Sequence, residues 1–147
     1  MISQTINQQI VDALKAHDAL RLSTLRMLSS AFNYERINKQ HELTEEEELE
    51  VVRKEAKKRK DAIEIYKNAN EHDRQDKEQK ELAILEEYLP SQMTDEEIMH
   101  LVEATIHEMG AIDQSQMGRI IGAVMHKTQG RADGGKVSEL VKQKLTQ

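Results

Sequence analysis

The stretch ELAILEEYLPSQMTDEEI, residues 81–98, decides how the chain is organised. Before its proline, apolar residues recur at the spacing of one helical face: Leu82, Leu85, Tyr88 and Leu89. Pro90, the only proline of the chain, disfavours helical geometry at the residue that precedes it. Thr94 and Glu97 then form a capping-box pattern, which predicts the start of a new helix. The stretch therefore predicts a boundary between two helical domains at about residue 90.

Residues 1–89 are expected to form an N-terminal helical bundle or hairpin domain. Hydrophobic periodicity predicts its helices: about residues 3–16, residues 18–39, a long helix that begins after Thr44, and a fourth helix that follows the polar stretch 68–80. Thr44 and Glu47 match a capping box, and the run Glu45–Glu48 places negative charge at the positive end of the third helix. The apolar face of that helix has a gap at Arg59, which we expect at the edge of the packing seam.

Residues 90–147 are expected to form a small C-terminal domain of three helices. The predicted spans are about residues 95–109 ending at Gly110, residues 115–128 ending near Gly130, and residues 135–145. The same periodicity predicts the core positions: Ile98, Leu101, Val102, Met109, Ile120, Ile121, Val124, Val137, Leu140, Val141 and Leu145. Gly118 and Gly122 are four residues apart, a spacing that predicts a close crossing between this helix and its neighbours.

The composition supports an all-α fold. The 147 residues are 33% charged and 3% aromatic, with one proline and six glycines, which favours charged amphipathic helices over a sandwich or a barrel. The absence of cysteine excludes disulfides, thiolate zinc sites, iron–sulfur clusters and a cysteine nucleophile. The first ten residues lack the pattern of a secretory leader, and no apolar stretch approaches the roughly 20 residues of a membrane span. We therefore expect a cytoplasmic protein that does not enter the membrane.

The net charge of −6, from 21 basic and 27 acidic residues, limits the ways in which the chain could bind RNA. Overall positive charge is not available, so any RNA contact requires a local basic patch. One basic run lies at residues 54–60. Because Glu50 precedes Lys54 by four residues and Glu55 precedes Arg59 by four, we interpret this run as a solvated helix face with many salt bridges.

Two patterns resemble ligand sites but have plainer explanations. Residues 130–136, GRADGGK, have the glycine and lysine spacing of a phosphate-binding loop, yet Val137 replaces the magnesium-binding hydroxyl and a helix precedes the segment instead of a strand. One helical face carries four potential metal ligands: Glu96, His100, Glu103 and His107. A metal site would usually need ligands from a second element. No catalytic triad or carboxylate pair stands out, so we predict no catalytic residue, no metal and no cofactor.

The GRADGGK segment has two compatible interpretations. In the structural one, Gly130 ends a helix in the left-handed conformation and Asp133 caps the next helix, and no ligand is needed. In the functional one, the helix start exposes N–H groups between Arg131 and Lys136, which suits an RNA phosphate or an acidic partner. All four aromatic residues precede Pro90, so RNA recognition by the second domain would use backbone, shape and arginine contacts instead of base stacking.

Five segments carry a family pattern: Arg21–Arg26 (RLSTLR), Leu89-Pro90, Met117–Met125 (MGRIIGAVM), Gly130–Gly134 (GRADG) and Val137–Val141 (VSELV). They closely resemble the GatB/YqeY family, and the whole chain resembles a stand-alone YqeY-like protein. The resemblance implies an N-terminal helical bundle followed by a three-helix domain. A similar domain forms the tail of the B subunit of the glutamine-dependent tRNA amidotransferase, where it helps to hold the tRNA.

The resemblance also implies an accessory role in tRNA binding or in tRNA amidotransfer. The family-level label is carbon–nitrogen ligase activity with glutamine as amido-N-donor. The chain lacks the large cradle domain that carries the kinase chemistry of the B subunit, and it shows no amidase Ser-Ser-Lys arrangement. We therefore do not expect it to be catalytic alone.

The leading hypothesis is that the second domain binds tRNA or another structured RNA through the surface formed by residues 119–136. The predicted phosphate contacts are Arg119, Lys127, Arg131 and Lys136. Gly130 and Gly134 would shape the turn, and Asp133 would cap the last helix. The alternative hypothesis is a non-catalytic protein–protein interaction adaptor. It would dock a partner on the charged hairpin, residues 44–88, or on the surface of the last helix.

Overall fold

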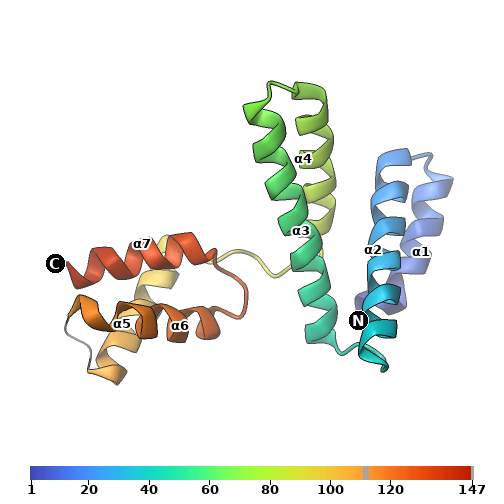
Figure 1. Cartoon of the computed structure of the whole chain (residues 1–147). Coiled ribbons are helices and arrows are strands. Elements are labelled where there is room, and N and C mark those ends of the chain that lie inside the picture. The colour runs from blue at the N-terminus through green and yellow to red at the C-terminus, as the bar shows by residue number, and fades with distance from the viewer. Residues whose placement is uncertain (111–112, 147) are drawn as a thin grey trace. The chain divides into compact units, whose positions relative to one another are not determined.

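The computed structural model describes residues 1–110 and 113–146, and this part of the chain is all-α, without strands. Its elements are α1 (Ile2–Lys15), α2 (Ala19–Lys39), α3 (Glu45–Asn68), α4 (His72–Glu86), α5 (Asp95–Met109), the short 3₁₀-helix η1 (Gln114–Gln116), α6 (Met117–Thr128) and α7 (Gly134–Leu145) (Figure 1). None of the described helices combines the length and the apolar character that crossing a membrane requires. Contacts divide the chain into two compact units, unit 1 (Met1–Leu89) and unit 2 (Pro90–Gln147).

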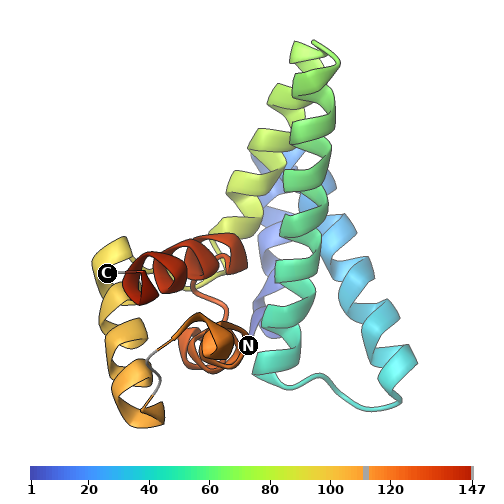
Figure 2. The same ribbon diagram turned by 60° about the vertical axis from the view of Figure 1, so that its left-hand side comes forward.

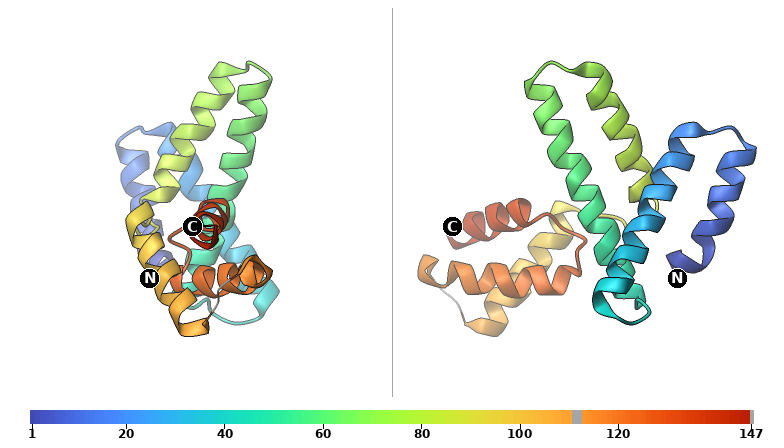
Figure 3. Two further views of the ribbon diagram at one scale, coloured as in Figure 1. Left: turned by 90° about the vertical axis from the view of Figure 1, so that its left-hand side faces the viewer. Right: turned by 45° about the vertical axis from the view of Figure 1, so that its right-hand side comes forward.

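Unit 1 consists of two helical hairpins, α1–α2 and α3–α4, joined by the turn that follows α2 (Figures 1 and 3). The predicted capping box at the start of α3 is confirmed: the Thr44 hydroxyl accepts from the Glu47 N–H at 3.2 Å, and the Glu47 carboxylate accepts from the Thr44 N–H at 2.9 Å. The buried core joins all four helices and the turn after α2: Ile6, Leu28, Phe32, Leu43, Val51, Val52 and Leu85.

Arg59 is buried in the seam between α3 and α4, so its predicted place at the edge of the seam is wrong. The residue is 5% exposed. Its guanidinium lies 2.8 Å from a carboxylate oxygen of Glu55 on the same helix and 3.5 Å from one of Glu81 on α4. The Glu55–Arg59 pair is therefore not part of a solvated face, whereas Lys57 and Lys58 are mostly exposed, as predicted for this run. Two carboxylates make the burial of the arginine tolerable.

Glu48, the last residue of the acidic run, is completely buried. Its carboxylate accepts hydrogen bonds from the N–H groups of Ile2, at 2.7 Å, and Ser3, at 3.3 Å, and from the Ser3 hydroxyl. These N–H groups belong to the first turn of α1, where no intrahelical partner exists. Glu48 therefore caps α1 from another helix.

A surface ion pair in unit 1 makes stability depend on pH. The Arg21 guanidinium donates to both carboxylate oxygens of Glu87, at 2.8 and 3.0 Å, and this contact lowers the pKa of Glu87 below its ordinary value. A lowered pKa in the folded state adds stability at neutral pH that is lost as the pH falls through that pKa. Glu87→Gln should lower the free energy of unfolding by less than about 1 kcal/mol at neutral pH, because the pair is exposed. In strong acid, where Glu87 is protonated, the substitution should have no effect on stability.

Thermal melts at neutral pH and near pH 3 check this, with the exposed neighbour Glu86→Gln as control. A Glu87→Gln deficit that persists unchanged in acid would contradict the expectation.

Unit 2 packs α5 against α6 and α7, which run antiparallel (Figures 1 and 2). Every core position predicted for this part of the chain is confirmed as buried or as packed on the buried cluster. The capping box of Thr94 and Glu97 starts α5, and Gly110, with φ of 64°, ends it as predicted. The N–H of Met93 donates to the Arg131 carbonyl at 2.8 Å, which ties the segment before α5 to the turn between α6 and α7.

The predicted close helix crossing at Gly118 and Gly122 is wrong. Both glycines are exposed, and a Cβ added at either would meet no atom within 4 Å. The buried face of α6 is set by Ile120 and Val124. Because two residues correspond to about 200° around a helix, the glycines lie on the opposite, outer face.

Candidate nucleic-acid interface

Charge is segregated within unit 2. Its six basic residues all lie on α6, on α7 or in the turn between them: Arg119, Lys127, Arg131, Lys136, Lys142 and Lys144. Five of its eight acidic residues lie on α5: Asp95, Glu96, Glu97, Glu103 and Glu108. We call α6, α7 and the turn 129–133 the hairpin surface.

The turn of the hairpin surface depends on two residues in the left-handed conformation. Gln129 ends α6 with φ of 51°, and Gly130 follows with φ of 76°. The predicted left-handed geometry at Gly130 is confirmed, although it begins one residue earlier. Gly134 has no positive φ, and an added Cβ would lie 3.8 Å from the end of the Met125 side chain. The backbone at Gly134 therefore does not require glycine.

Asp133 caps α7, as predicted. Its carboxylate accepts from the N–H of Lys136 at 3.3 Å. A Cβ added at Gly135 would lie 3.0 Å from that carboxylate, so glycine here leaves room for the cap. Since a negative charge already occupies the positive end of α7, a phosphate would be repelled from the helix start itself. An anionic ligand would have to use side chains beside it.

Three of the four predicted phosphate contacts already have partners within unit 2. Lys127 lies 2.7 Å from a carboxylate oxygen of Glu108 and donates to the Thr105 hydroxyl at 3.2 Å. The Arg131 Nε–H donates to the Ser91 carbonyl at 2.9 Å. These contacts hold the hairpin surface to α5 and to the segment before it.

Lys136 is the third predicted contact with a partner: its ammonium nitrogen lies 3.4 Å from a carboxylate oxygen of Asp95 on α5. Arg119, the fourth predicted contact, is exposed and forms no ion pair with any residue that the structure describes. Lys142 shares these two properties and was missed in the sequence. Lys144, by contrast, pairs with Glu103 at 3.2 Å. Arg119 and Lys142 are thus the exposed cations of the hairpin surface without a partner among the described residues, whereas Arg131 is held by a neutral carbonyl and forms no ion pair within this part of the chain.

The candidate metal face on α5 does not gather ligands. Within residues 1–110 and 113–146, no three histidine, aspartate or glutamate side chains are placed to bind one metal ion. One of the four candidates, Glu103, is engaged by Lys144.

A match to a known protein family extends over both units of the chain. A family model described as Yqey-like protein matches residues 3–145. The chain belongs to the YqeY-like family. This match confirms the resemblance drawn from the five sequence segments. An uncharacterized protein of the fission yeast Schizosaccharomyces pombe, C22F3.15, is 29% identical over 89 residues, which are 60% of this chain and 72% of the yeast protein.

The basic hairpin surface of this YqeY-like protein was only partly visible in its sequence. The basic residues can be recognised in the sequence, but the residues that pair with them cannot, because they are 19 to 41 positions away. Examples are Lys127 with Glu108 and Arg131 with Ser91. The missed Lys142 had one local signal, its place in the last turn of a helix, where basic residues favour the helix dipole. That signal does not distinguish a binding residue from a stabilising one.

Proposed function

We propose that this YqeY-like protein is an accessory RNA-binding protein that holds tRNA on the hairpin surface of unit 2. The observation that carries the proposal is the charge segregation: all basic residues of unit 2 lie on this surface, in a chain whose net charge is −6. Phosphate contacts supply most of the affinity of such complexes, and a local patch is sufficient for them. The resemblance to the tRNA-holding tail of the amidotransferase B subunit points to the same partner.

The paired and unpaired cations would have different roles. Arg119 and Lys142 would contact phosphates directly, because both are exposed and neither is engaged by any described residue. Lys127 and Lys136 form partly exposed pairs with α5. Pairs of this kind contribute little, so a phosphate could replace the carboxylate at small cost. The proposal assigns no catalytic step to this chain, and an amidotransfer reaction would belong to a partner enzyme.

The test is binding of total cellular tRNA by the full chain across a salt series. Arg119→Glu with Lys142→Glu should weaken binding by tenfold or more at low salt. Each lost phosphate contact should flatten the slope of log K against log salt by about 0.7–0.9. Arg131 and Lys136 are less suitable, because reversing them would also break contacts to Ser91 and Asp95.

The matched control is Lys77→Glu with Lys80→Glu, two exposed lysines of α4 in unit 1, which changes the net charge by the same amount. Equal weakening by the control would show that overall charge, and not the hairpin surface, governs binding. Absence of tRNA binding by the unaltered protein at low salt would overturn the proposed function.

A further inference from the structure

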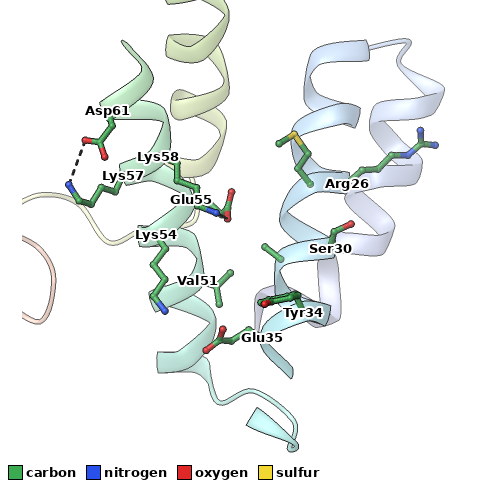
Figure 4. A pocket seen from close by; sticks show the side chains of 12 residues that line it. Arg26, Ser30, Tyr34, Glu35, Val51, Lys54, Glu55, Lys57, Lys58 and Asp61 are labelled. Carbon is green, nitrogen blue, oxygen red and sulfur yellow. Dashed lines mark hydrogen bonds and ion pairs between the residues drawn. The ribbon is translucent and has the colours of Figure 1, made fainter. Parts of the chain in front are cut away.

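A groove opens between α2 and α3 within unit 1 (Figure 4). Its volume is about 980 Å³, and its lining is mainly apolar. Met27, Ala31 and Tyr34 line it from α2, and Val51 lines it from α3.

The α2 side of the groove is an exposed apolar stripe. Tyr34 is 74% exposed, Ile37 72% and Met27 47%. With Ser30 these residues are separated by three, four and three positions, so they follow one face of the helix. Ile37 extends the stripe beyond the groove. A surface with this spacing is complementary to another amphipathic helix, which can insert side chains from its own positions i, i+3 or i+4, and i+7.

The charged residues around the groove leave it with free positive charge. Glu55 is paired with Lys58 at 2.9 Å and with buried Arg59, and Asp61 lies 3.6 Å from Lys57. Arg26 on α2 and Lys54 on α3 form no ion pair with any described residue, and Figure 4 shows them on opposite walls. Glu35 is the lining carboxylate that remains without an ion pair among the described residues. Two cations and one carboxylate of the lining are therefore without an ion pair among the described residues.

We propose that this groove binds an amphipathic helix of a partner protein, with apolar side chains on its inner face and carboxylates along its flanks. The apolar side chains would fill the space beside Tyr34 and Val51, and the flanking carboxylates would meet Arg26 and Lys54. The α2 wall of this groove lies outside the two surfaces of the adaptor hypothesis, and the proposal does not depend on tRNA binding by unit 2.

Two other occupants fit the groove less well. RNA would bring its many phosphates against a groove whose lining includes the carboxylates of Glu35, Glu55 and Asp61. A second copy of the chain, paired symmetrically through this groove, would bring two surfaces that each carry Arg26 and Lys54 into one interface. Like charges opposed in an interface disfavour it. An acidic helix contributes only a few charges and meets neither problem.

The probe is a displayed library of single-helix peptides of about 18 residues, or five turns. Each peptide has leucines at the spacing i, i+3 or i+4, and i+7, and its flanking positions are randomised among Glu, Gln and Lys. The full-length protein is the bait. Glutamate should be enriched over lysine at the flanks by roughly fivefold or more, as two rim ion pairs allow. The bait Arg26→Glu with Lys54→Glu should reverse this preference and enrich lysine.

Tyr34→Asp should abolish retention of the selected peptides. The matched control is Ile65→Asp, which alters a side chain of similar exposure, 66%, outside the groove and should leave retention unchanged. Both variants replace exposed residues, and thermal melts of the two proteins establish that they fold. Equal retention by the Tyr34→Asp bait, or the same flank preference on the charge-reversed bait, would overturn the proposal.

Two further results would assign the groove to another occupant and overturn the proposal. One is a dimer of the unaltered protein by light scattering that Tyr34→Asp converts to a monomer. The other is displacement of a bound selected peptide by tRNA. If tRNA also displaced the peptide from the control Ile65→Asp and from the hairpin variant Arg119→Glu with Lys142→Glu, RNA would bind in the groove itself.

Discussion

Arg59→Ala is expected to lower the free energy of unfolding by about 3–5 kcal/mol. The guanidinium lies between Glu55 and Glu81, whose side chains are 12% and 7% exposed. Removal of the arginine would leave Glu81 buried without its cation and would open a cavity in the seam between α3 and α4. Breaking a buried pair from one side is costly for this reason, even where the intact pair contributes little. Chemical denaturation followed by far-ultraviolet circular dichroism measures the loss.

The deficit of Arg59→Ala should depend on pH. Burial, and next the charge of Glu81, raise the pKa of Glu78, whereas Arg59 lowers it. Without Arg59, Glu78 should bind a proton more readily in the folded state. A raised pKa destabilises the folded protein at pH values above the ordinary pKa, and this penalty disappears as the carboxylate is protonated. The deficit should therefore be largest at neutral pH and shrink toward about pH 4.5.

Two variants separate burial from charge. Lys58 also binds Glu55, at 2.9 Å, but its side chain is 69% exposed, so Lys58→Ala should cost less than about 0.5 kcal/mol. Arg59→Met combined with Glu81→Leu removes both charges and fills the seam, and it should fall within about 1.5 kcal/mol of the unaltered protein. If the double variant were as unstable as Arg59→Ala, the loss would come from side-chain shape and not from the unpaired carboxylate.

Local signals in the sequence predicted the helices well. The capping boxes at Thr44 and Thr94 involve residues three positions apart, so the chemistry that starts each helix is complete within a short segment. The core of unit 2 was equally predictable, because Val102, Val124 and Val141 lie on stripes that alternate with charged residues. Such features need no knowledge of distant parts of the chain.

The sequence failed where a residue's environment depends on a distant partner. Arg59 lies in a run with the composition of a solvated helix face, and one of the two carboxylates that compensate its burial, Glu81, lies 22 positions later. Gly118 and Gly122 have the spacing of a close crossing, but the neighbours of α6 lie on its other face. The same limit applies to the candidate site: the cations of the hairpin surface were identifiable, but which of them α5 neutralises was not. The free pair, Arg119 and Lys142, therefore had to come from the structure.

Glu48→Ala is the second variant with a large expected effect, about 2–4 kcal/mol. The carboxylate is completely buried and accepts from the N–H groups of Ile2 and Ser3 and from the Ser3 hydroxyl. Alanine would leave these donors without a protein acceptor and would create a cavity at the junction of α1 and α3. The loss should be concentrated in α1, so its amides should exchange hydrogen faster than those of α3 and α4 in the same variant.

Glu46→Ala supplies the matched control for Glu48, because Glu46 lies in the same first turn of α3 but is exposed. Both variants remove one negative charge from the positive end of α3, so the helix-dipole contribution, about 0.3–1 kcal/mol, is common to both. Only Glu48→Ala also removes the cap of α1. Similar stability losses in the two variants would mean that Glu48 acts through the dipole of its own helix. A loss larger by about 2 kcal/mol, with selective exchange in α1, would establish that a buried side chain of the second hairpin fixes the start of the first.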